Sequence, residues 1–282
     1  MATQLADAEV SKPQIAVPDS TCTKTSGCQP TATTVRAVFI SDTHLGCTYA
    51  QVDVLCHFLS ELRPDFIYLV GDFIDGWELR RRFTWCSDST RVVRMLLDLT
   101  RQGTRVRYAV GNHDDFLRGD SLLSELVMTG GFEIAEEFEH VTGDQRRFLV
   151  VHGDRFDEYE KQSPLFCWIT SAFYNLMLAG NWRLSRYCGG SRDKVSKRLK
   201  SWFGSISRHV ATFRSLLSGY ARDRGYDGVI CGHVHAPEQT TVNGFEYCNT
   251  GDWLENCSAI MEHTDGTLSL RFADCPPDYK AS

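Results

Sequence analysis

The chain has 282 residues, of which 42% are hydrophobic and 23% are charged, and its formal net charge is −6. This length and composition are typical of a globular protein with one large domain, and the negative charge excludes a chain that binds nucleic acid through its overall charge. The eleven cysteines are scattered without a CxxC pair, which excludes a disulfide framework and favours the reduced thiols of a cytoplasmic protein.

The two ends of the chain differ from the middle in composition. Residues 1–34 are rich in Thr, Ser, Ala, Gln and Pro and show no periodicity, so we predict a disordered N-terminal tail. This stretch also lacks a basic segment followed by an apolar core, so no signal peptide is expected. We predict one domain over residues 35–275 and a short C-terminal tail over residues 276–282.

The first part of the domain alternates between strand-like and helix-like segments. Short apolar runs, which are typical of strands buried on both faces, lie at residues 35–40, 66–70, 105–110, 146–151 and 227–231. Apolar residues with a spacing near 3.6 predict helices over residues 49–63 and 89–103, between the first three of these strands. This alternation predicts parallel strands joined by crossover helices.

The rest of the domain shows a helical segment followed by hairpin signals instead of this alternation. Residues 157–226 contain helical patterns and no strand-like run, so we predict a helical cap inserted into the fold. The pairs Asn243-Gly244 and Asp265-Gly266 each stand between two strand-like runs and predict two β-hairpins. Together these segments predict an α/β sandwich that contains both parallel and antiparallel strands.

Each of the five predicted strands runs into Asp, His or Asn with glycine close by. The segments are SDTHLG (41–46), GDFIDG (71–76), GNHDD (111–115), HGD (152–154) and GHVH (232–235). Because ligands bind beyond the carboxyl ends of strands in α/β sheets, we expect these side chains on one rim. Alternate residues of an extended chain share a face, which would pair Asp42 with His44 and His233 with His235. The expected rim contains Asp42, His44, Asp72, Asn112, His113, His152, His233 and His235.

These carboxylate, imidazole and amide donors suit divalent ions such as Mn²⁺, Fe²⁺ or Zn²⁺. The set is too large for one tetrahedral site and large enough for two octahedral sites that share a bridging carboxylate. Two such metals hold both ends of an in-line phosphoryl displacement. The histidines outside the motifs are interpreted as surface or packing residues; they are His57, His140, His209 and His263.

The five motifs occur in the order D-x-H, G-D, G-N-H-D, H-G-D and G-H-x-H. From residue 35 to about residue 272, this ordered set resembles that of the calcineurin-like metallophosphoesterases. The longer stretches YLVGDFIDGWELRRR, VHGDRFD and NTGDWLENCSAIMEH resemble the UDP-2,3-diacylglucosamine diphosphatase branch, and within it a divergent second subgroup. The resemblance implies a four-layer αββα sandwich of two mixed β-sheets flanked by helices. It also implies a dinuclear centre that usually holds Mn²⁺, with Fe²⁺, Zn²⁺ or Mg²⁺ as alternatives.

The same resemblance implies a role for each residue of the rim. The first metal would be held by Asp42, His44 and His235, and the second by Asn112, His152 and His233. Asp72 would bridge the two metals, and a bridging hydroxide would be the nucleophile. His113 would stabilise the transition state or protonate the leaving oxygen, and Asp114 would orient it. The best-known members of the diphosphatase branch carry arginine at the position of His113, whereas histidine is typical of phosphoesterases at large.

The predicted cap combines an apolar stretch with a basic one, as a site for a lipid and a phosphate would. Residues 164–180 carry no charge, and residues 183–208 are strongly basic. Acyl chains would pack on Phe166 and Trp168, and a diphosphate would meet Arg80, Arg81, Arg192, Lys194, Lys197 and Lys200. The alternative is a cap packed on its own core with a solvated charged face. The apolar stretch is shorter than a membrane span, which favours peripheral attachment to the inner face of the membrane.

Three functions are open at this point. The first is hydrolysis of a UDP-linked acylated glucosamine, such as UDP-2,3-diacylglucosamine, to UMP and a lipid sugar phosphate. The second is a general phosphodiesterase or phosphatase that acts on soluble nucleotides or phosphoproteins. The third is a non-catalytic scaffold with the same fold, which is disfavoured because every expected metal ligand is present.

Overall fold

The computed structural model describes residues 35–119, 121–157 and 200–274. The predicted tails and residues 158–199 of the predicted cap lie outside these residues. Within the described part of the chain, none of the helices combines the length and the apolar character needed to cross a membrane.

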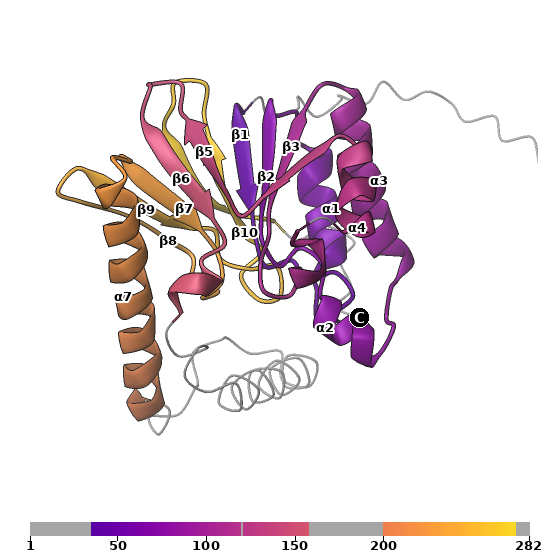
Figure 1. Cartoon of the computed structure of the whole chain (residues 1–282), viewed down its shortest axis with the longest axis horizontal. Coiled ribbons are helices and arrows are strands. Elements are labelled where there is room, and N and C mark those ends of the chain that lie inside the picture. Colours follow the sequence, from indigo (N-terminus) through magenta and orange to yellow (C-terminus); the bar gives the residue numbers. More distant parts are fainter. Residues whose placement is uncertain (1–34, 120, 158–199, 275–282) are drawn as a thin grey trace, which may run out of the picture. The chain divides into compact units, whose positions relative to one another are not determined.

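The first sheet has six strands in the order β11-β10-β1-β2-β3-β4, and its last four strands are parallel (Figure 1). The strands are β1 (Ala37–Ile40), β2 (Phe66–Val70), β3 (Arg105–Ala109), β4 (Phe132–Ala135), β10 (Ser258–Glu262) and β11 (Leu268–Phe272). Helix α1 (Val52–Ser60) follows β1, and helices α2 (Gly76–Arg81) and α3 (Ser87–Arg101) follow β2. The predicted parallel units with crossover helices are therefore confirmed.

The second sheet has five strands in the order β5-β6-β7-β9-β8. They are β5 (Glu137–Val141), β6 (Arg147–Val151), β7 (Gly228–Cys231), β8 (Glu238–Val242) and β9 (Phe245–Asn249). Strand β7 is parallel to β6 and β9, whereas the two outer pairs are antiparallel. Both predicted hairpins are confirmed, because β8 pairs with β9 and β10 pairs with β11. The five strands behind the predicted rim are thus divided between two sheets.

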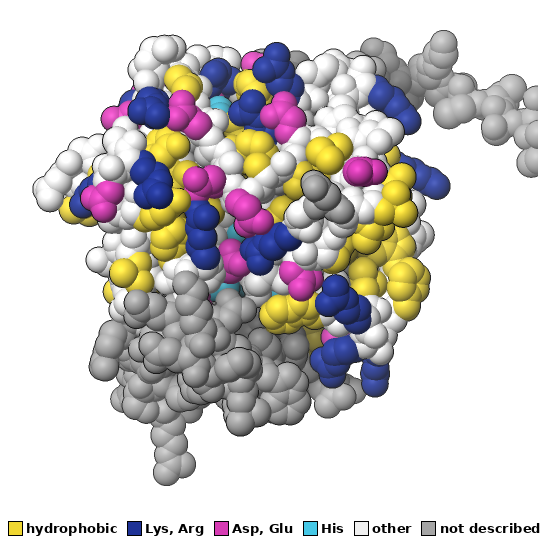
Figure 2. Space-filling view, in the orientation of Figure 1, with side chains coloured by type: hydrophobic (Ala, Val, Ile, Leu, Met, Phe, Trp, Pro, Cys, Tyr) yellow, Lys and Arg dark blue, Asp and Glu magenta, His cyan; other side chains and the backbone are white. Residues whose placement is uncertain are grey.

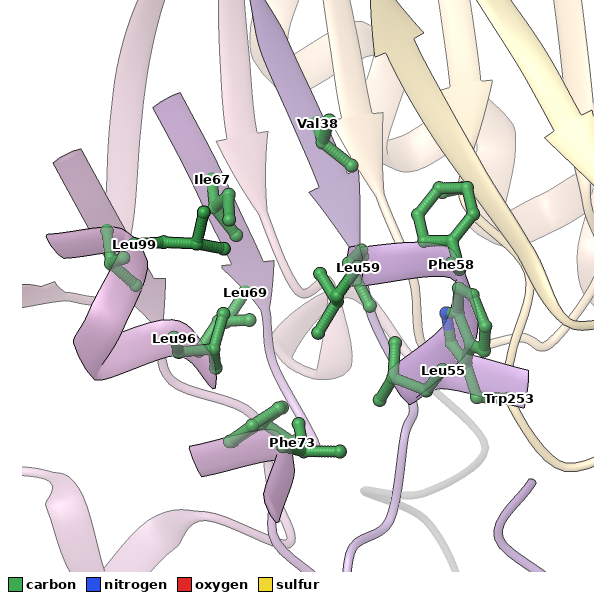
Figure 3. Close-up of a cluster of buried hydrophobic side chains, with 14 of the residues drawn as sticks. Val38, Leu55, Phe58, Leu59, Ile67, Leu69, Phe73, Leu96, Leu99 and Trp253 are labelled. Carbon is green, nitrogen blue, oxygen red and sulfur yellow. The ribbon is translucent and has the colours of Figure 1, made fainter. Parts of the chain in front are cut away.

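The core consists of three layers of side chains around the two sheets. Along β1, alternate residues face opposite sides, so Val38 packs beneath α1 and α3, whereas Phe39 lies between the sheets. Figure 3 shows Leu55 and Leu59 of α1 directed toward the strands of the first sheet. Buried residues of both sheets form the middle cluster, which includes Phe39, Tyr68, Val70, Phe148, Val150 and Ile230.

Helix α7 (Lys200–Asp223) covers the outer face of the second sheet. Its buried side chains Phe213, Leu217 and Ala221 pack on Leu149 and Val229. This helix falls within the predicted cap, yet it is the fourth layer of an αββα sandwich. The predicted fold class is therefore confirmed, and the limits of the cap stay a prediction.

A buried polar network links the two sheets. The carboxylate of Glu262 on β10 accepts hydrogen bonds from Arg36 at 2.6 Å and from His140 Nε2 on β5 at 2.8 Å. The other ring nitrogen of His140 lies 2.9 Å from the hydroxyl of Tyr68 on β2. Because Glu262 is fully buried, these bonds satisfy a charge that would otherwise be costly to remove from water. His140 is a packing residue, as predicted.

Candidate metal centre

The structure brings the predicted rim together at the carboxyl ends of β1, β2, β3, β6 and β7. Three groups of side chains have ligand atoms within 4.8 Å of one another. The groups are Asp42, His44 and His235; His44, Asp72 and His113; and Asp42, Asp72 and His152. Asn112 joins them because its Oδ1 lies 3.2 Å from His152 Nε2, and the His233 ring lies edge-on to the His152 ring at 5.2 Å.

Asp72 lies between the two predicted sets of metal ligands. Its Oδ2 is 3.9 Å from His44 Nε2, which belongs to the first set, and 3.3 Å from His152 Nε2, which belongs to the second. The side chain is buried, and it lies close to a predicted ligand of each metal in a site shielded from solvent.

The backbone of the ligands is not extended, so the sequence-based reason for pairing Asp42 with His44 and His233 with His235 is wrong. These four residues and Asp72 have φ angles between +46° and +68°. Left-handed backbone is strained for residues with a side chain, and such residues cluster at functional sites. Backbone hydrogen bonds hold the conformation here, for example from Asp42 N to Gly71 O at 3.1 Å and from His44 N to Asp72 O at 2.9 Å.

Two glycines allow the strand ends to approach one another. A Cβ added to Gly71 would lie 2.3 Å from the His152 ring, and one added to Gly111 would lie 2.2 Å from Asp72 Oδ1. Both distances are far below van der Waals contact, so only glycine lets these ligands come together.

The histidines are oriented by hydrogen-bond acceptors behind them. His152 Nδ1 donates to Val70 O at 2.9 Å, which turns Nε2 toward Asp72 and Asn112. His44 Nδ1 lies 3.2 Å from Asp75 Oδ2, which leaves Nε2 facing the other ligands. An acceptor on the outer nitrogen is the usual partner of a metal-binding histidine because it fixes the tautomer and the ring.

The donor set fits divalent cations. His44 Nε2 is buried and has no hydrogen-bond partner among the described residues, although it lies 4.0 Å from Asp42 Oδ1 and 3.9 Å from Asp72 Oδ2. Burial would raise the pKa of Asp42, but His235 beside it lowers that pKa to about 2. Burial also opposes ionisation of Asp72, yet His152 and His113 hold its pKa well below the usual range. Two ionised carboxylates and an unpaired imidazole nitrogen are good ligands for such ions.

His113 stands at the edge of this cluster and is oriented by Asp75. Its Nδ1 lies 3.0 Å from Asp75 Oδ1, and its Nε2 lies 3.9 Å from Asp72 Oδ2. Burial lowers the pKa of His113, but the charges of Asp72 and Asp75 outweigh burial and raise it to about 9. The ring is therefore protonated at neutral pH in the metal-free protein.

The prediction that Asp114 orients His113 is wrong. Asp114 instead accepts hydrogen bonds from the backbone N–H groups of Ile74 at 2.9 Å and Phe73 at 3.2 Å. It therefore fixes the loop after β2, where Asp72 and Asp75 lie.

Asp157 and His209 adjoin the centre and were not found from the sequence. Asp157 Oδ2 lies 3.1 Å from His233 Nε2 and 3.2 Å from His209 Nε2 on α7. No motif contains His209, and its closeness to His233 arises only because α7 covers the second sheet. The sole available signal was Asp157 in the stretch VHGDRFD.

Few of the predicted substrate residues lie in the described part of the chain. Arg80 and Arg81 are largely exposed on α2 and lie 3.5 Å from Asp115 and Glu78, respectively. Lys200 begins α7, but its side chain is not described. The residues outside the described ranges are Phe166, Trp168, Arg192, Lys194 and Lys197.

Comparison with known proteins gives consistent matches. The calcineurin-like phosphoesterase family profile matches residues 35–237. The UDP-2,3-diacylglucosamine hydrolase of Haemophilus influenzae is 21% identical over 241 residues, which cover 80% of this chain and 94% of the relative. The enzyme of the same name from Neisseria meningitidis strain MC58 is 27% identical over 238 residues, covering 80% and 92%. A solved archaeal phosphodiesterase is 14% identical with a TM-score of 0.43, covering 84% of this chain and 98% of its own.

Proposed function

The chain belongs to the calcineurin-like phosphoesterase family and is a metal-dependent phosphohydrolase, and on this premise we propose that it hydrolyses a UDP-linked acylated glucosamine. For UDP-2,3-diacylglucosamine, water would add to the phosphorus next to uridine, giving UMP and 2,3-diacylglucosamine 1-phosphate. Hydrolysis is supported above all by the position of Asp72, a buried carboxylate that lies between ligands of the two predicted metal sites.

The rim residues would hold two divalent ions. Asp42, His44 and His235 would bind one, Asn112, His152 and His233 the other, and Asp72 both. We propose Mn²⁺ as the native metal, because mixed carboxylate, amide and imidazole donors suit it; Fe²⁺, Zn²⁺ and Mg²⁺ are the alternatives. When bound, such ions activate water and neutralise charge on the phosphoryl oxygens.

His113 is the proposed catalytic residue that does not bind metal. Asp75 holds its Nδ1, so its Nε2 faces the centre beside Asp72. From there Nε2, when it carries a proton, would donate it to the leaving oxygen or donate a hydrogen bond to the phosphoryl group in the transition state.

The identity of the substrate is supported by the relatives named UDP-2,3-diacylglucosamine hydrolase, which the chain matches over 80% of its length. At 21% and 27% identity, these relatives support the class of substrate, a nucleotide-linked lipid, rather than one particular compound. The second candidate, a phosphodiesterase for soluble nucleotides, is favoured by His113, the residue typical of phosphoesterases at large.

We further propose that the enzyme works at the cytoplasmic face of a membrane with anionic lipids. The side chains of Arg80 and Arg81 are 61% and 72% exposed, and Phe83, just beyond α2, is 81% exposed. Figure 2 shows Lys or Arg and hydrophobic side chains together over the region of α2. An apolar side chain among positive charges suits contact with anionic headgroups and the acyl boundary.

A substrate panel with Mn²⁺-loaded protein tests the proposal. We expect turnover of UDP-2,3-diacylglucosamine with UMP as the nucleotide product. Turnover of bis(p-nitrophenyl) phosphate with none of the lipid would support the soluble phosphodiesterase instead. Absence of turnover with both, at full metal loading, would contradict the hydrolase.

A further inference from the structure

The exposed indole of Trp77 lies against the proposed catalytic histidine. The centroids of the Trp77 and His113 rings are 4.1 Å apart, and their planes differ by 29°, which is a stacked arrangement. Trp77 is nevertheless 40% exposed, so the hydrophobic core does not account for its place. No motif of the rim includes this residue.

The imidazole of His113 is contacted from three directions. Asp75 Oδ1 lies 3.0 Å from Nδ1, in a position to accept its hydrogen. The His44 ring meets it edge-on, with centroids 4.6 Å apart and planes at 88°. Trp77 covers a face of the ring. A hydrogen bond at one nitrogen leaves the ring able to tilt about that atom, whereas stacking on a face fixes its plane.

The first turn of α2 is itself fixed to the backbone of His113. Gly76 N donates to His113 O at 3.2 Å, and Asp75 caps the helix by accepting from Glu78 N at 2.8 Å. A Cβ on Gly76 would lie 2.7 Å from His113 O, so glycine is required for this close approach. Trp77 therefore directly follows Asp75 and Gly76, both of which contact His113.

We propose that Trp77 is a positioning residue that holds the His113 ring in the plane from which Nε2 reaches the reacting phosphoryl group. The inference rests on the proposed function, in which His113 Nε2 acts beside Asp72. Catalytic groups lose much of their effect when they are slightly misplaced, so loss of the stack lowers turnover without changing substrate binding. An indole that instead served as a platform for the substrate would act on KM.

A double-mutant cycle separates these cases, using Mn²⁺-loaded protein and bis(p-nitrophenyl) phosphate. We expect Trp77→Leu to lower kcat about tenfold at unchanged KM, equivalent to about 1.4 kcal/mol. Trp77→Phe should restore most of the loss, because it keeps an aromatic face. In the His113→Ala background, Trp77→Leu should have almost no further effect, because residues that act through one another are not additive. Phe272→Leu, at an aromatic residue 53% exposed on β11, is the matched control.

A second measurement does not depend on turnover. In the Mg²⁺-loaded, diamagnetic protein, the ring current of Trp77 should shift the NMR signals of the His113 ring protons. The shift should persist in Trp77→Phe and disappear in Trp77→Leu, with His113→Ala identifying the signals.

The inference is overturned if Trp77→Leu leaves kcat and the ring-proton signals unchanged, or if it alters only KM. It is also overturned if Trp77→Leu lowers kcat by the same factor in the His113→Ala background. Wild-type turnover in His113→Ala would overturn both this inference and the role proposed for His113. A His113→Ala variant with reduced but measurable turnover, in which Trp77→Leu still lowers kcat about tenfold, would overturn the inference alone.

Discussion

Replacing Gly71 with alanine should damage both stability and metal binding. Gly71 has a φ of +81°, and the added Cβ would lie 2.3 Å from the ring of His152. That ring is fully buried and is held by its hydrogen bond to Val70 O at 2.9 Å, so it cannot move aside without losing its orientation. The matched control is Gly244→Ala, at a glycine with a φ of +76° and no atom within 4 Å of the added Cβ.

The difference between the two variants follows from their surroundings. A side chain in left-handed backbone costs about 1–2 kcal/mol at either position, and overpacking at Gly71 adds about 1–3 kcal/mol. We therefore expect Gly71→Ala to lose about 2–5 kcal/mol of unfolding free energy and Gly244→Ala about 1–2 kcal/mol. Because the clash falls on a predicted ligand, only Gly71→Ala should bind Mn²⁺ at least ~10-fold more weakly.

Guanidinium unfolding of the metal-free proteins and calorimetric titration with Mn²⁺ measure the two effects separately. Equal destabilisation of the two variants would refute the packing argument. Wild-type Mn²⁺ affinity in Gly71→Ala, with the protein folded, would refute the placement of His152 as a ligand.

Three further predictions concern other parts of the protein. Glu262→Gln should lower the unfolding free energy by about 2 kcal/mol at pH 7. Burial opposes ionisation of Glu262, but its hydrogen bonds lower its pKa in the folded state, so the difference in unfolding free energy from wild type should close as pH falls below about 4.3. A difference that grows in acid would contradict this pH dependence. Asp157→Asn should weaken Mn²⁺ binding by about 10-fold or more in calorimetry because Asp157 contacts His233, and unchanged affinity would make the contact incidental. The double change Arg81→Ser, Phe83→Ser should reduce cosedimentation with phosphatidylglycerol vesicles while leaving turnover of bis(p-nitrophenyl) phosphate unchanged, and equal cosedimentation would exclude this surface.

The sequence predicts the centre of the fold well and its margins poorly. Strands β1, β2 and β7 are recognisable because they are largely buried and continuously apolar, and β3 and β6 keep buried apolar residues beside their arginines. Strands β4 and β5 were missed because FEIA and EFEHV contain glutamates, and both strands lie at sheet edges, where charged residues are tolerated. Helix α2 was missed because six residues are too few to show a helical period.

The candidate centre is predictable as a set of residues but not as a geometry. Order along the chain and position after each strand identify the residues that meet, because the carboxyl ends of these strands lie together although the strands belong to two sheets. The left-handed backbone of Asp42 and Asp72 is not encoded by a local pattern. Asp75 and Asp114 both stand within motifs of the sequence, and the motifs do not show that Asp75 is the one that faces His113. His209 could not be found because its helix approaches the centre only in three dimensions.

If two metals joined through Asp72 make this chain a hydrolase, metal binding and turnover should rise together in a single titration. Metal-free protein is titrated with Mn²⁺ while bound metal and turnover of UDP-2,3-diacylglucosamine are followed together. We expect activity to rise with the binding of two ions per chain, and we expect Asp72→Asn to lose both metal and activity. Turnover that survives chelation, or full binding and activity in Asp72→Asn, would contradict it.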